Sequence, residues 1–482
     1  MKDTFISDSI IYIGADDKDI DLFESQYVVP NGISYNSYLI KDEKNVVMDT
    51  IDGRKTDEWL SNLENALSGA KPDYLVISHL EPDHAYNVGL LAEKFPDMLL
   101  VGNAKTFDML NQFFDIDVEN RKVVVKEGDT LNIGKHTLKF FMATMVHWPE
   151  VMVTYEESEK ILFSADGFGK FGALDTEEDW ACEARRYYFN IVGKYGAQVQ
   201  ALLKKAANLD IKMICPLHGP ILKENLGYYI GKYDIWSSYT PEDKGTLVAY
   251  ASIHGNTKKV AEEVVKILKE KGEEKVAITD LTRDDMAEAI EDAFRYDKVI
   301  LLAASYNAGV FPPMEQFLHH LKGKNYQKRK IGFVENASWA PSAGRCMKEI
   351  VSGMKDIEIC EPMITIKSTM KKDDVIKLEE LVDNILNKYE LTSDIIPMCI
   401  MRSISGNSTF AILVNIFENY GPDSLMGILA SVVQGSSDTT FYVIALYFGS
   451  VGIIKSRYAL PAGLFADLVG IIASFVLVYT FI

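Results

Sequence analysis

The sequence predicts an α/β protein of several domains: a two-sheet sandwich flanked by helices, a doubly wound α/β unit, and an apolar helical tail. Three observations predict this order. Short runs of apolar residues separated by turn residues occupy positions 1–243. Predicted strands alternate with amphipathic helices over positions 244–390. Positions 391–482 then hold eight Asp, Glu, Lys or Arg residues in 92. We therefore expect three domains with these boundaries.

The first region has the pattern of short buried strands. The predicted strands are Ile10–Ile13, Ser37–Ile40, Val46–Met48, Tyr74–Ile77, Met98–Val101, Val123–Val125, Leu138–Ala143 and Val151–Tyr155. Turn signals such as Asn31-Gly32 and Ile133-Gly134 separate them. Helical periodicity appears at Thr56–Leu67 and Trp180–Ala207, and we expect these helices outside the sheets.

One stretch of this region concentrates possible metal ligands. The strand Tyr74–Ile77 is followed by His79, Glu81, Asp83 and His84. Two imidazoles and two carboxylates are costly to bury unpaired, so this cluster indicates a cation site. In an extended loop, alternation directs His79, Glu81 and Asp83 one way and His84 the other, which would let one segment serve two cations. The alternative is a polar loop with a capping aspartate.

Three further ligand candidates follow apolar runs later in the region. His147 lies in MVHWPE, Asp166 in ILFSADGFGKFG and His218 in MICPLHGP. Each of these residues follows an apolar run and is flanked by turn residues. This is the position at which the last side chain of a strand points into a cleft. A histidine in such a place is otherwise an ordinary core or surface residue.

These seven positions, with the phrases HWPE and SADGFGKFG, resemble the metallo-β-lactamase-like module of flavodiiron proteins, also called A-type flavoproteins. The resemblance covers about residues 1–390 and implies an αββα sandwich for the first module. It also implies two non-haem iron ions. One would be held by His79, Glu81 and His147, the second by Asp83, His84 and His218, with Asp166 bridging both. Zinc hydrolases of this fold typically have histidine in place of Glu81, and a carboxylate there favours iron.

The second region predicts a doubly wound sheet. Its strands are expected at Thr246–Ala251, Val276–Ile278, Val299–Ala304, Ile331–Val334 and Met363–Ile366. The first intervening helix has Val260, Val264, Ile267 and Leu268 on one face. Ligands of such sheets bind outside the carboxyl ends of the strands.

Three of these strand ends carry candidate flavin contacts. The first offers hydroxyls and amides at a helix start, which hold a phosphate without a Lys or Arg, although a plain helix cap has the same pattern. No GK[ST] follows, which argues against a nucleoside triphosphate P-loop. The other two ends each place one aromatic in a loop of small residues, as stacking on a flat ring requires. The candidates are Ser252, His254, Gly255, Asn256 and Thr257; Ser305, Tyr306, Asn307 and Ala308; and Asn336, Ala337, Ser338 and Trp339.

This half resembles a flavodoxin domain that binds FMN, and the order of modules is that of the flavodiiron family. The chain departs from the family pattern at two places. Ala304 and Ser305 stand where many relatives have Pro-Thr, and His254 replaces a commoner Tyr. These departures bear on the individual flavin contacts and on the flavin potential.

The overall composition limits the functional class and the cellular compartment that we expect for this protein. A formal charge of −19 argues against a nucleic-acid partner. Five cysteines without a CxxC pair predict free thiols in a reducing cytoplasm and no built-in rubredoxin, iron–sulfur or zinc-ribbon module. The N-terminus lacks the pattern of a signal peptide.

The tail resembles the carboxyl-terminal half of the spore maturation protein B family. The resemblance rests on RSISGNS from Arg402, YGPDS from Tyr420 and QGSSDTTFY from Gln434. Thr439–Ile454 and Leu460–Ile482 are apolar, and polar patches between them suit a broken membrane segment. We expect membrane contact here, and a buried helical hairpin of a soluble protein is the alternative. Because only half of that family's length is present, the tail is expected to be a tether, a gene fusion without its own activity or a fusion artefact as readily as a transporter.

The flavodiiron resemblance implies reduction of dioxygen to water or of nitric oxide to nitrous oxide, with no catalytic residues beyond the metal ligands. Electrons would come from an external donor such as rubredoxin, a nicotinamide-linked reductase or a reduced deazaflavin. The resemblance also implies a head-to-tail homodimer, or a dimer of dimers. The alternatives are a zinc-dependent hydrolase with a flavodoxin module, and a membrane or spore-maturation component.

Overall fold

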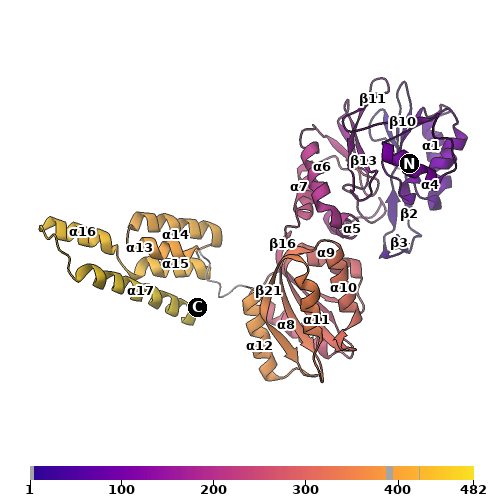
Figure 1. Ribbon diagram of the computed structural model, residues 1–482. Helices are drawn as coiled ribbons and strands as arrows, with labels where there is room; N and C mark the ends of the chain where they lie inside the picture. The colour runs from indigo at the N-terminus through magenta and orange to yellow at the C-terminus, as the bar shows by residue number, and fades with distance from the viewer. Residues whose placement is uncertain (1–4, 387–393, 423, 482) are drawn as a thin grey trace. The chain divides into compact units, whose positions relative to one another are not determined.

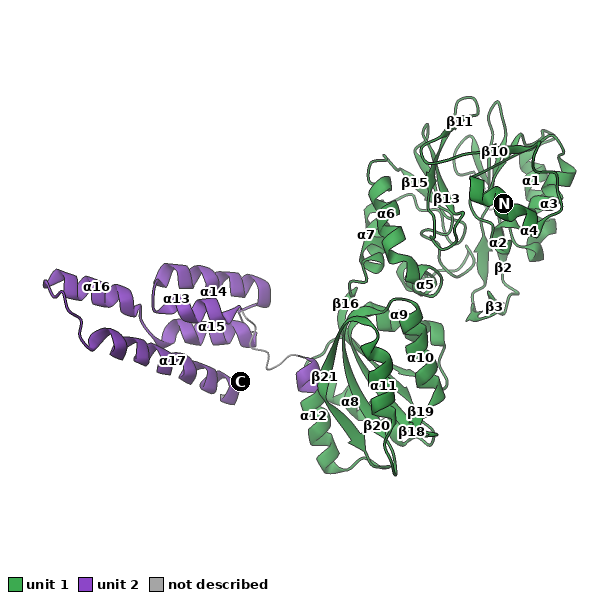
Figure 2. Cartoon of the chain, viewed as in Figure 1, with its two compact units in different colours: residues 1–381 green, residues 382–482 purple. Residues whose placement is uncertain are grey.

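The computed structural model describes residues 5–386, 394–422 and 424–481. The chain forms two compact units, residues 1–381 and 382–482, which Figure 2 shows in separate colours. The predicted boundary at 390/391 lies outside the described residues. Residues 243 and 244 fall inside the larger unit, so a domain boundary between them stays a prediction.

Two sheets form the first part of the larger unit (Figure 1). Their strand orders are β1-β6-β7-β8-β9-β10 and β11-β12-β13-β14-β15. The first sheet contains β1 Ile10–Tyr12, β6 Tyr38–Ile40, β7 Val46–Met48, β8 Tyr74–Val76, β9 Leu99–Gly102 and β10 Lys122–Val124. The second contains β11 Thr130–Asn132, β12 Thr137–Met142, β13 Met152–Glu156, β14 Ile161–Phe163 and β15 Met213–Cys215. Two small ribbons pair β2 (Ala15–Asp17) with β5 (Ile33–Tyr35) and β3 (Leu22–Phe23) with β4 (Tyr27–Val28).

The sheets pack face to face around one apolar core. Tyr38 and Val76 of the first sheet share this core with Phe140 and Phe163 of the second, and the Tyr38 and Phe163 rings lie 5.4 Å apart. Helices α1 (Thr56–Leu67), α3 (Val88–Lys94) and α4 (Ala104–Phe113) cover the first sheet. Helices α5 (Trp180–Tyr187), α6 (Gly196–Ala206) and α7 (Leu226–Ser237) cover the second. The predicted αββα sandwich is therefore confirmed.

The eight predicted strands of this region are present to within one or two residues, and α1 has the predicted bounds. The predicted helix over Trp180–Ala207 is wrong as a continuous element. A π-helical turn at Tyr188–Val192 and a 3-10 turn at Gly193–Tyr195 separate α5 from α6. A Cβ on Gly196 would lie 2.4 Å from the Ser237 carbonyl oxygen, so this glycine lets α6 begin against the end of α7.

The second part of the larger unit is a parallel sheet of order β17-β16-β18-β20-β21. This 2-1-3-4-5 order is that of flavodoxin-like folds. The strands are β16 Asp243–Ala251, β17 Val276–Asp280, β18 Tyr296–Tyr306, β20 Gln327–Asn336 and β21 Lys355–Ile366, and the short β19 (Gly309–Val310) pairs with β18. The helices are α8 Asn256–Glu270, α9 Met286–Arg295, α10 Pro312–Gly323, α11 Ala343–Ser352 and α12 Lys372–Ile385. All five predicted strands are confirmed, and the predicted apolar face of α8 is buried.

The smaller unit is helical, as the sequence predicts. After the end of α12 it contains α13 Ile395–Arg402, α14 Gly406–Tyr420, α15 Leu425–Ser436, α16 Thr440–Ser450 and α17 Ala459–Phe481. The polar patch from Gly435 to Thr440 breaks α15 from α16. In α17, the 22-residue segment Ala459–Thr480 contains an 18-residue window with a mean hydropathy of 2.1 and is long enough to cross a bilayer.

Candidate functional site

The first four candidate ligands lie at the carboxyl end of β8. His79 and Glu81 precede α2 (Pro82–Ala85), and Asp83 and His84 lie on that helical turn. Pro82 at the first helical position fixes the backbone for a turn rather than a strand. The expected alternation of an extended loop is therefore wrong for Asp83, which joins His84 and not His79 and Glu81.

The other three candidates come from the second sheet. His147 lies between β12 and β13, Asp166 follows β14 and His218 follows β15. Strands β14 and β15 are parallel, with Phe163 paired to Cys215, so Asp166 and His218 leave the sheet at the same end. Residues far apart in sequence thus reach one place because the two sheets present their loops together.

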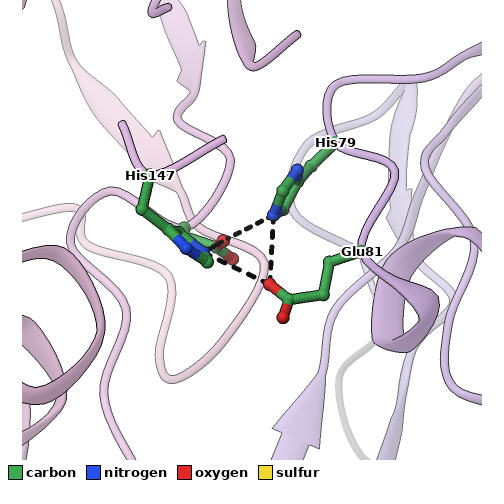
Figure 3. Close-up of side chains that lie close together, drawn as sticks. His79, Glu81 and His147 are labelled. Atoms are coloured by element: carbon green, nitrogen blue, oxygen red, sulfur yellow. Dashed lines mark hydrogen bonds and ion pairs between the residues drawn. The ribbon is translucent and has the colours of Figure 1, made fainter. Parts of the chain in front are cut away.

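One group of side chains contains His79, Glu81, His147 and Asp166. Figure 3 shows His79, Glu81 and His147 pointing toward one another. The Glu81 Oε2 atom lies 3.2 Å from His79 Nε2 and 3.2 Å from His147 Nε2. The Asp166 Oδ2 atom lies 3.4 Å from His79 Nε2 and 3.2 Å from His147 Nε2. All four residues therefore direct one donor atom at a common point.

The second group contains Asp83, His84 and His218. The Asp83 Oδ2 atom lies 3.3 Å from His84 Nε2 and 3.2 Å from His218 Nε2. The other oxygen of Asp166, Oδ1, lies 3.1 Å from His84 Nε2 and 3.8 Å from His218 Nε2. Asp166 thus offers one oxygen to each group.

The separations fit two cations. Donor atoms held at ~2.1 Å around a tetrahedral ion lie about 3.4 Å apart. Within the described part of the chain, several buried donor atoms also lack a hydrogen-bond partner: both Asp83 oxygens, His84 Nε2, Asp166 Oδ1 and His218 Nε2. Buried polar atoms without a partner are costly, and a bound cation satisfies them.

Backbone and carboxylate acceptors fix two of the imidazoles. The His218 Nδ1–H donates to the Ser34 carbonyl oxygen at 2.7 Å, which leaves Nε2 free to coordinate. His79 Nδ1 lies 2.8 Å from the carboxylate of buried Glu150, which also accepts from Leu80 N at 2.9 Å. We did not predict these roles of Glu150 and Ser34. The HWPE motif contains Glu150 and could have indicated its role. Ser34 acts through its backbone carbonyl, which no sequence motif indicates.

The carboxylates also set the protonation of the histidines. Burial disfavours charging His147, but Asp166 and Glu81 outweigh it and raise the His147 pKa to about 9. Burial likewise opposes charging His84, while Asp83 and Asp166 raise its pKa to about 8. A cation that binds here therefore displaces protons.

The flavin candidates gather at one edge of the second sheet. Strands β16, β18 and β20 are adjacent and parallel, with Ala251 paired to Ala303 and Ala304 paired to Asn336. Their carboxyl ends therefore meet. The strand order reverses between β16 and β18, which is where ligands bind in such folds.

The first of these loops leads directly into α8. Ser252 and His254 lie in the turn, Gly255 has a φ of +87° that favours glycine, and Asn256 and Thr257 open the helix. Ser252 Oγ accepts from Gly255 N at 3.0 Å, and Thr257 is buried. The arrangement presents backbone N–H groups at a helix start, as phosphate binding requires.

The other two loops expose their aromatics. Tyr306 ends β18 and is 44% exposed, and Trp339 follows β20 and is 83% exposed. Asn307 and Ala308 form the tight turn to β19. Ser305 Oγ accepts from the backbone N–H groups of Ser342, which caps α11, and of Ala343, its first residue. Asn336 Nδ2 donates to the Ser368 carbonyl oxygen, and Ser338 Oγ lies 2.7 Å from Ser368 Oγ; Ala337 lies between them. Two exposed aromatics at one sheet edge fit a flat ring that covers them.

Comparisons with known proteins agree with this arrangement. The model of the ODP family of β-lactamase domains matches residues 33–219, and a flavodoxin domain model matches residues 247–351. An uncharacterized protein of Methanocaldococcus jannaschii is 31% identical over 382 residues, which cover 78% of this chain and 96% of that protein. An anaerobic nitric oxide reductase flavorubredoxin of Escherichia coli is 29% identical over 350 residues, 70% of this chain and 73% of that protein.

Two solved structures resemble the chain at 26% identity and a TM-score of 0.74 each. They are the rubredoxin:oxygen oxidoreductase of Desulfovibrio gigas and the flavodiiron protein of Giardia intestinalis. Each match covers 80% of this chain, with 98% and 96% of the respective structures.

A β-lactamase-type sandwich with a two-metal cluster, followed by a flavodoxin-type sheet, defines a class of redox protein. The chain belongs to the flavodiiron protein family, and it is an oxidoreductase. The matches of the two family models end at residues 219 and 351, so the resemblance of the tail to spore maturation protein B stays a prediction.

Proposed function

We propose that this protein reduces dioxygen to two water molecules with four electrons and four protons, or two nitric oxide molecules to nitrous oxide and one water with two electrons and two protons. The two relatives named for such reactions, the flavorubredoxin and the rubredoxin:oxygen oxidoreductase, support this choice of substrates. The single observation that carries the proposal is the carboxylate of Asp166, which offers one oxygen to each group of ligands.

The cofactors are FMN and a non-haem diiron centre. When bound, the iron pair supplies electrons to the gas, and FMN replaces them. We assign His79, Glu81 and His147 to one iron, Asp83, His84 and His218 to the other, and Asp166 to both. Three carboxylates offset most of the charge of two ferrous ions, and Glu150 and the Ser34 carbonyl hold two imidazoles in the coordinating orientation.

We also propose that electrons pass between subunits of a head-to-tail homodimer. His147 shares a hollow with His319, His320 and Lys324 at the end of α10, whereas the flavin loop with Tyr306 lies before its start. The hollow is lined by α10 from Gln316 to the C-cap residue Lys324, so its lining residues lie about 6 to 18 Å along the helix from the start at Pro312. If the FMN of a partner subunit lay against this hollow, the electron path from FMN to His147 would be shorter than the path within one subunit.

The electron donor is assigned to a separate protein or a reduced soluble cofactor. The five cysteines of the sequence contain no CxxC pair, which supports the absence of a rubredoxin module from residues 1–482. Their scattered positions also support a reducing cytoplasm as the place of the catalytic domains.

We further propose that α17 attaches the protein to a membrane. Its side chains Phe465, Leu468 and Ile472 are 67%, 53% and 54% exposed, while the carboxyl group of Asp467 is buried within the helical unit. An apolar outer face with its charge turned inward is typical of a helix in lipid.

Flotation of the full chain with liposomes tests this attachment. Wild-type protein should rise with the vesicles, and the double variant Leu468→Lys, Ile472→Lys should rise far less, because each lysine costs about 3 kcal/mol in the bilayer. Ile376→Lys in α12, at a position 65% exposed, is the control. Wild-type protein that stays with the soluble fraction would rule out the attachment.

The catalytic proposal is tested by anaerobic purification, metal and flavin analysis, and gas-electrode assays with dioxygen and with nitric oxide. We expect about two irons and one FMN per chain, with consumption of at least one gas by the reduced enzyme. Zinc in place of iron, together with hydrolysis and no gas consumption, would instead establish the alternative of a zinc hydrolase.

A further inference from the structure

A mostly apolar cavity of about 240 Å³ lies between the second sheet and the helices α6 and α7. Its sheet wall includes Leu162 and Ile214, and its helix wall includes Val199 and Leu203. Its inner end is formed by Val146, Gly167 and Phe168. Val146 precedes His147, and Gly167 follows Asp166, so the cavity reaches the backbone that carries two of the assigned metal ligands.

The polar side chains in the lining are already engaged. Ser164 Oγ donates to the Gly167 carbonyl oxygen at 2.6 Å, and Tyr233 Oη accepts from Phe168 N at 2.6 Å. Lys205 Nζ donates to Glu127 at 2.9 Å and to the Met142 carbonyl oxygen at 3.0 Å. An ordered water needs two or more polar partners, and a polar ligand needs similar contacts. The lining therefore favours an apolar occupant.

The cavity extends from the metal loops toward the protein surface. Val199 is buried, whereas Leu202, Leu203 and Ala206 of the same helix are partly exposed. The apolar space therefore begins near solvent at the end of α6 and ends behind the segments that hold His147 and Asp166. Cavities of this kind, lined by aliphatic side chains, stay dry and take up small apolar molecules.

We propose that this cavity is a binding site for the diatomic gas, which it concentrates next to the metal centre. The inference rests on the proposed function for the identity of the gas. Dioxygen and nitric oxide are small, uncharged and weakly hydrated, so they enter a dry aliphatic space without losing hydrogen bonds. The volume exceeds that of one diatomic molecule, so several can be held behind Phe168.

Xenon-pressurised crystals of the holoprotein test the site directly, because xenon density does not depend on activity. We expect xenon between α6 and the second sheet. Ala206→Phe places a ring at the outer end of the cavity and should remove that xenon. Ala201→Phe, the same change at an exposed position of α6, is the matched control and should leave it in place.

Steady-state kinetics test the supply of gas. In Ala206→Phe we expect KM for the gas to rise at least about threefold while kcat, iron and FMN content stay at wild-type values. Val199→Ile, which adds one methylene to the lining, should give a smaller rise and serves if the phenylalanine variant does not fold. Ala201→Phe should match wild type.

Three outcomes overturn the inference. Absence of xenon from the wild-type cavity does so whether or not the protein consumes gas. Xenon in the cavity with an unchanged KM in both lining variants excludes a role in gas supply. Continuous chain-like density in the cavity of the purified protein would identify an acyl chain as the occupant. Xenon bound to a holoprotein that consumes neither gas would instead contradict the proposed function and, with it, the identity of the gas.

Discussion

The Oδ1 atom of Asp166 lies 3.1 Å from Nε2 of His84, and its Oδ2 atom lies 3.2 Å from Nε2 of His147. One carboxylate, placed at the end of β14, thus faces both halves of the cluster. The segment after β8 supplies different side chains to the two halves, and the loop after β15 supplies His218 to one of them. The two-metal character of the site therefore depends on this residue.

Replacing Asp166 by Asn keeps the size of the side chain and removes the charge and one acceptor oxygen. We expect gas consumption to fall at least about a hundredfold, because the metals lose their shared ligand. Metal analysis should show less than two irons per chain, with FMN unchanged. Asp108→Asn, at an exposed position of α4, should behave as wild type. An Asp166→Asn variant with normal rate and iron content would exclude the bridging role.

Glu150→Gln tests the support of His79. The buried carboxylate accepts from the His79 ring and from Leu80 N, and the amide keeps the volume but not the charge. Loss of such a partner typically weakens metal affinity about 10- to 100-fold. Competition with a chelator, followed by iron analysis, measures this. Equal iron retention in Glu150→Gln and wild type would show that Glu150 is structural only.

Trp339→Ala tests the flavin edge. The ring is 83% exposed in this structure, and we expect the FMN ring to cover it. Its loss should weaken FMN binding about tenfold, measured by flavin fluorescence on titration of flavin-free protein, and should leave the iron content unchanged. Tyr228→Ala, which removes a 39% exposed aromatic on α7, is the control. If both variants bind FMN like wild type, the indole does not contact the flavin.

His136 predicts a pH dependence of stability away from both cofactor sites. Burial disfavours its charged form, but Asp42 and Glu159, at 2.6 and 3.1 Å, raise its pKa above the usual value. A raised pKa in the folded state stabilises the protein fully below the unfolded pKa of about 6.5, and this stabilisation is lost as pH rises through the folded pKa.

Thermal unfolding at pH 6 and pH 9 measures this contribution. The loss of midpoint temperature between the two pH values should be larger in wild type than in His136→Gln. His319→Gln, at an exposed position, should keep the wild-type difference. Parallel pH profiles for wild type and His136→Gln would show that this ring does not link stability to pH.

Local pattern was enough for much of the fold. The strand Val46–Met48 and the helix Thr56–Leu67 have the predicted bounds. Both patterns, a buried apolar run and an apolar face at helical spacing, can be recognised within one short segment of sequence. In the sequence, strands β14 and β15 are marked only by the apolar runs before Asp166 and His218, which set no bounds. Strands β3 and β4 were not predicted, because each has two residues, one of them exposed.

For the candidate site, some predictions agree with the structure and others do not. The seven ligand candidates converge in two groups, and the resemblance to flavodiiron proteins divided them as the structure does. Alternation alone placed Asp83 wrongly, because Pro82 begins a helical turn. The contact of His218 with Ser34 could not be predicted, since it joins residues 184 apart in sequence through a backbone carbonyl.

Anomalous diffraction at the iron edge, on crystals of anaerobically purified protein, tests the central claim most directly. Two iron peaks are expected, one on each side of the Asp166 carboxylate. A single peak, peaks at the zinc edge instead, or no metal between His79, His84, His147 and His218 would contradict the account.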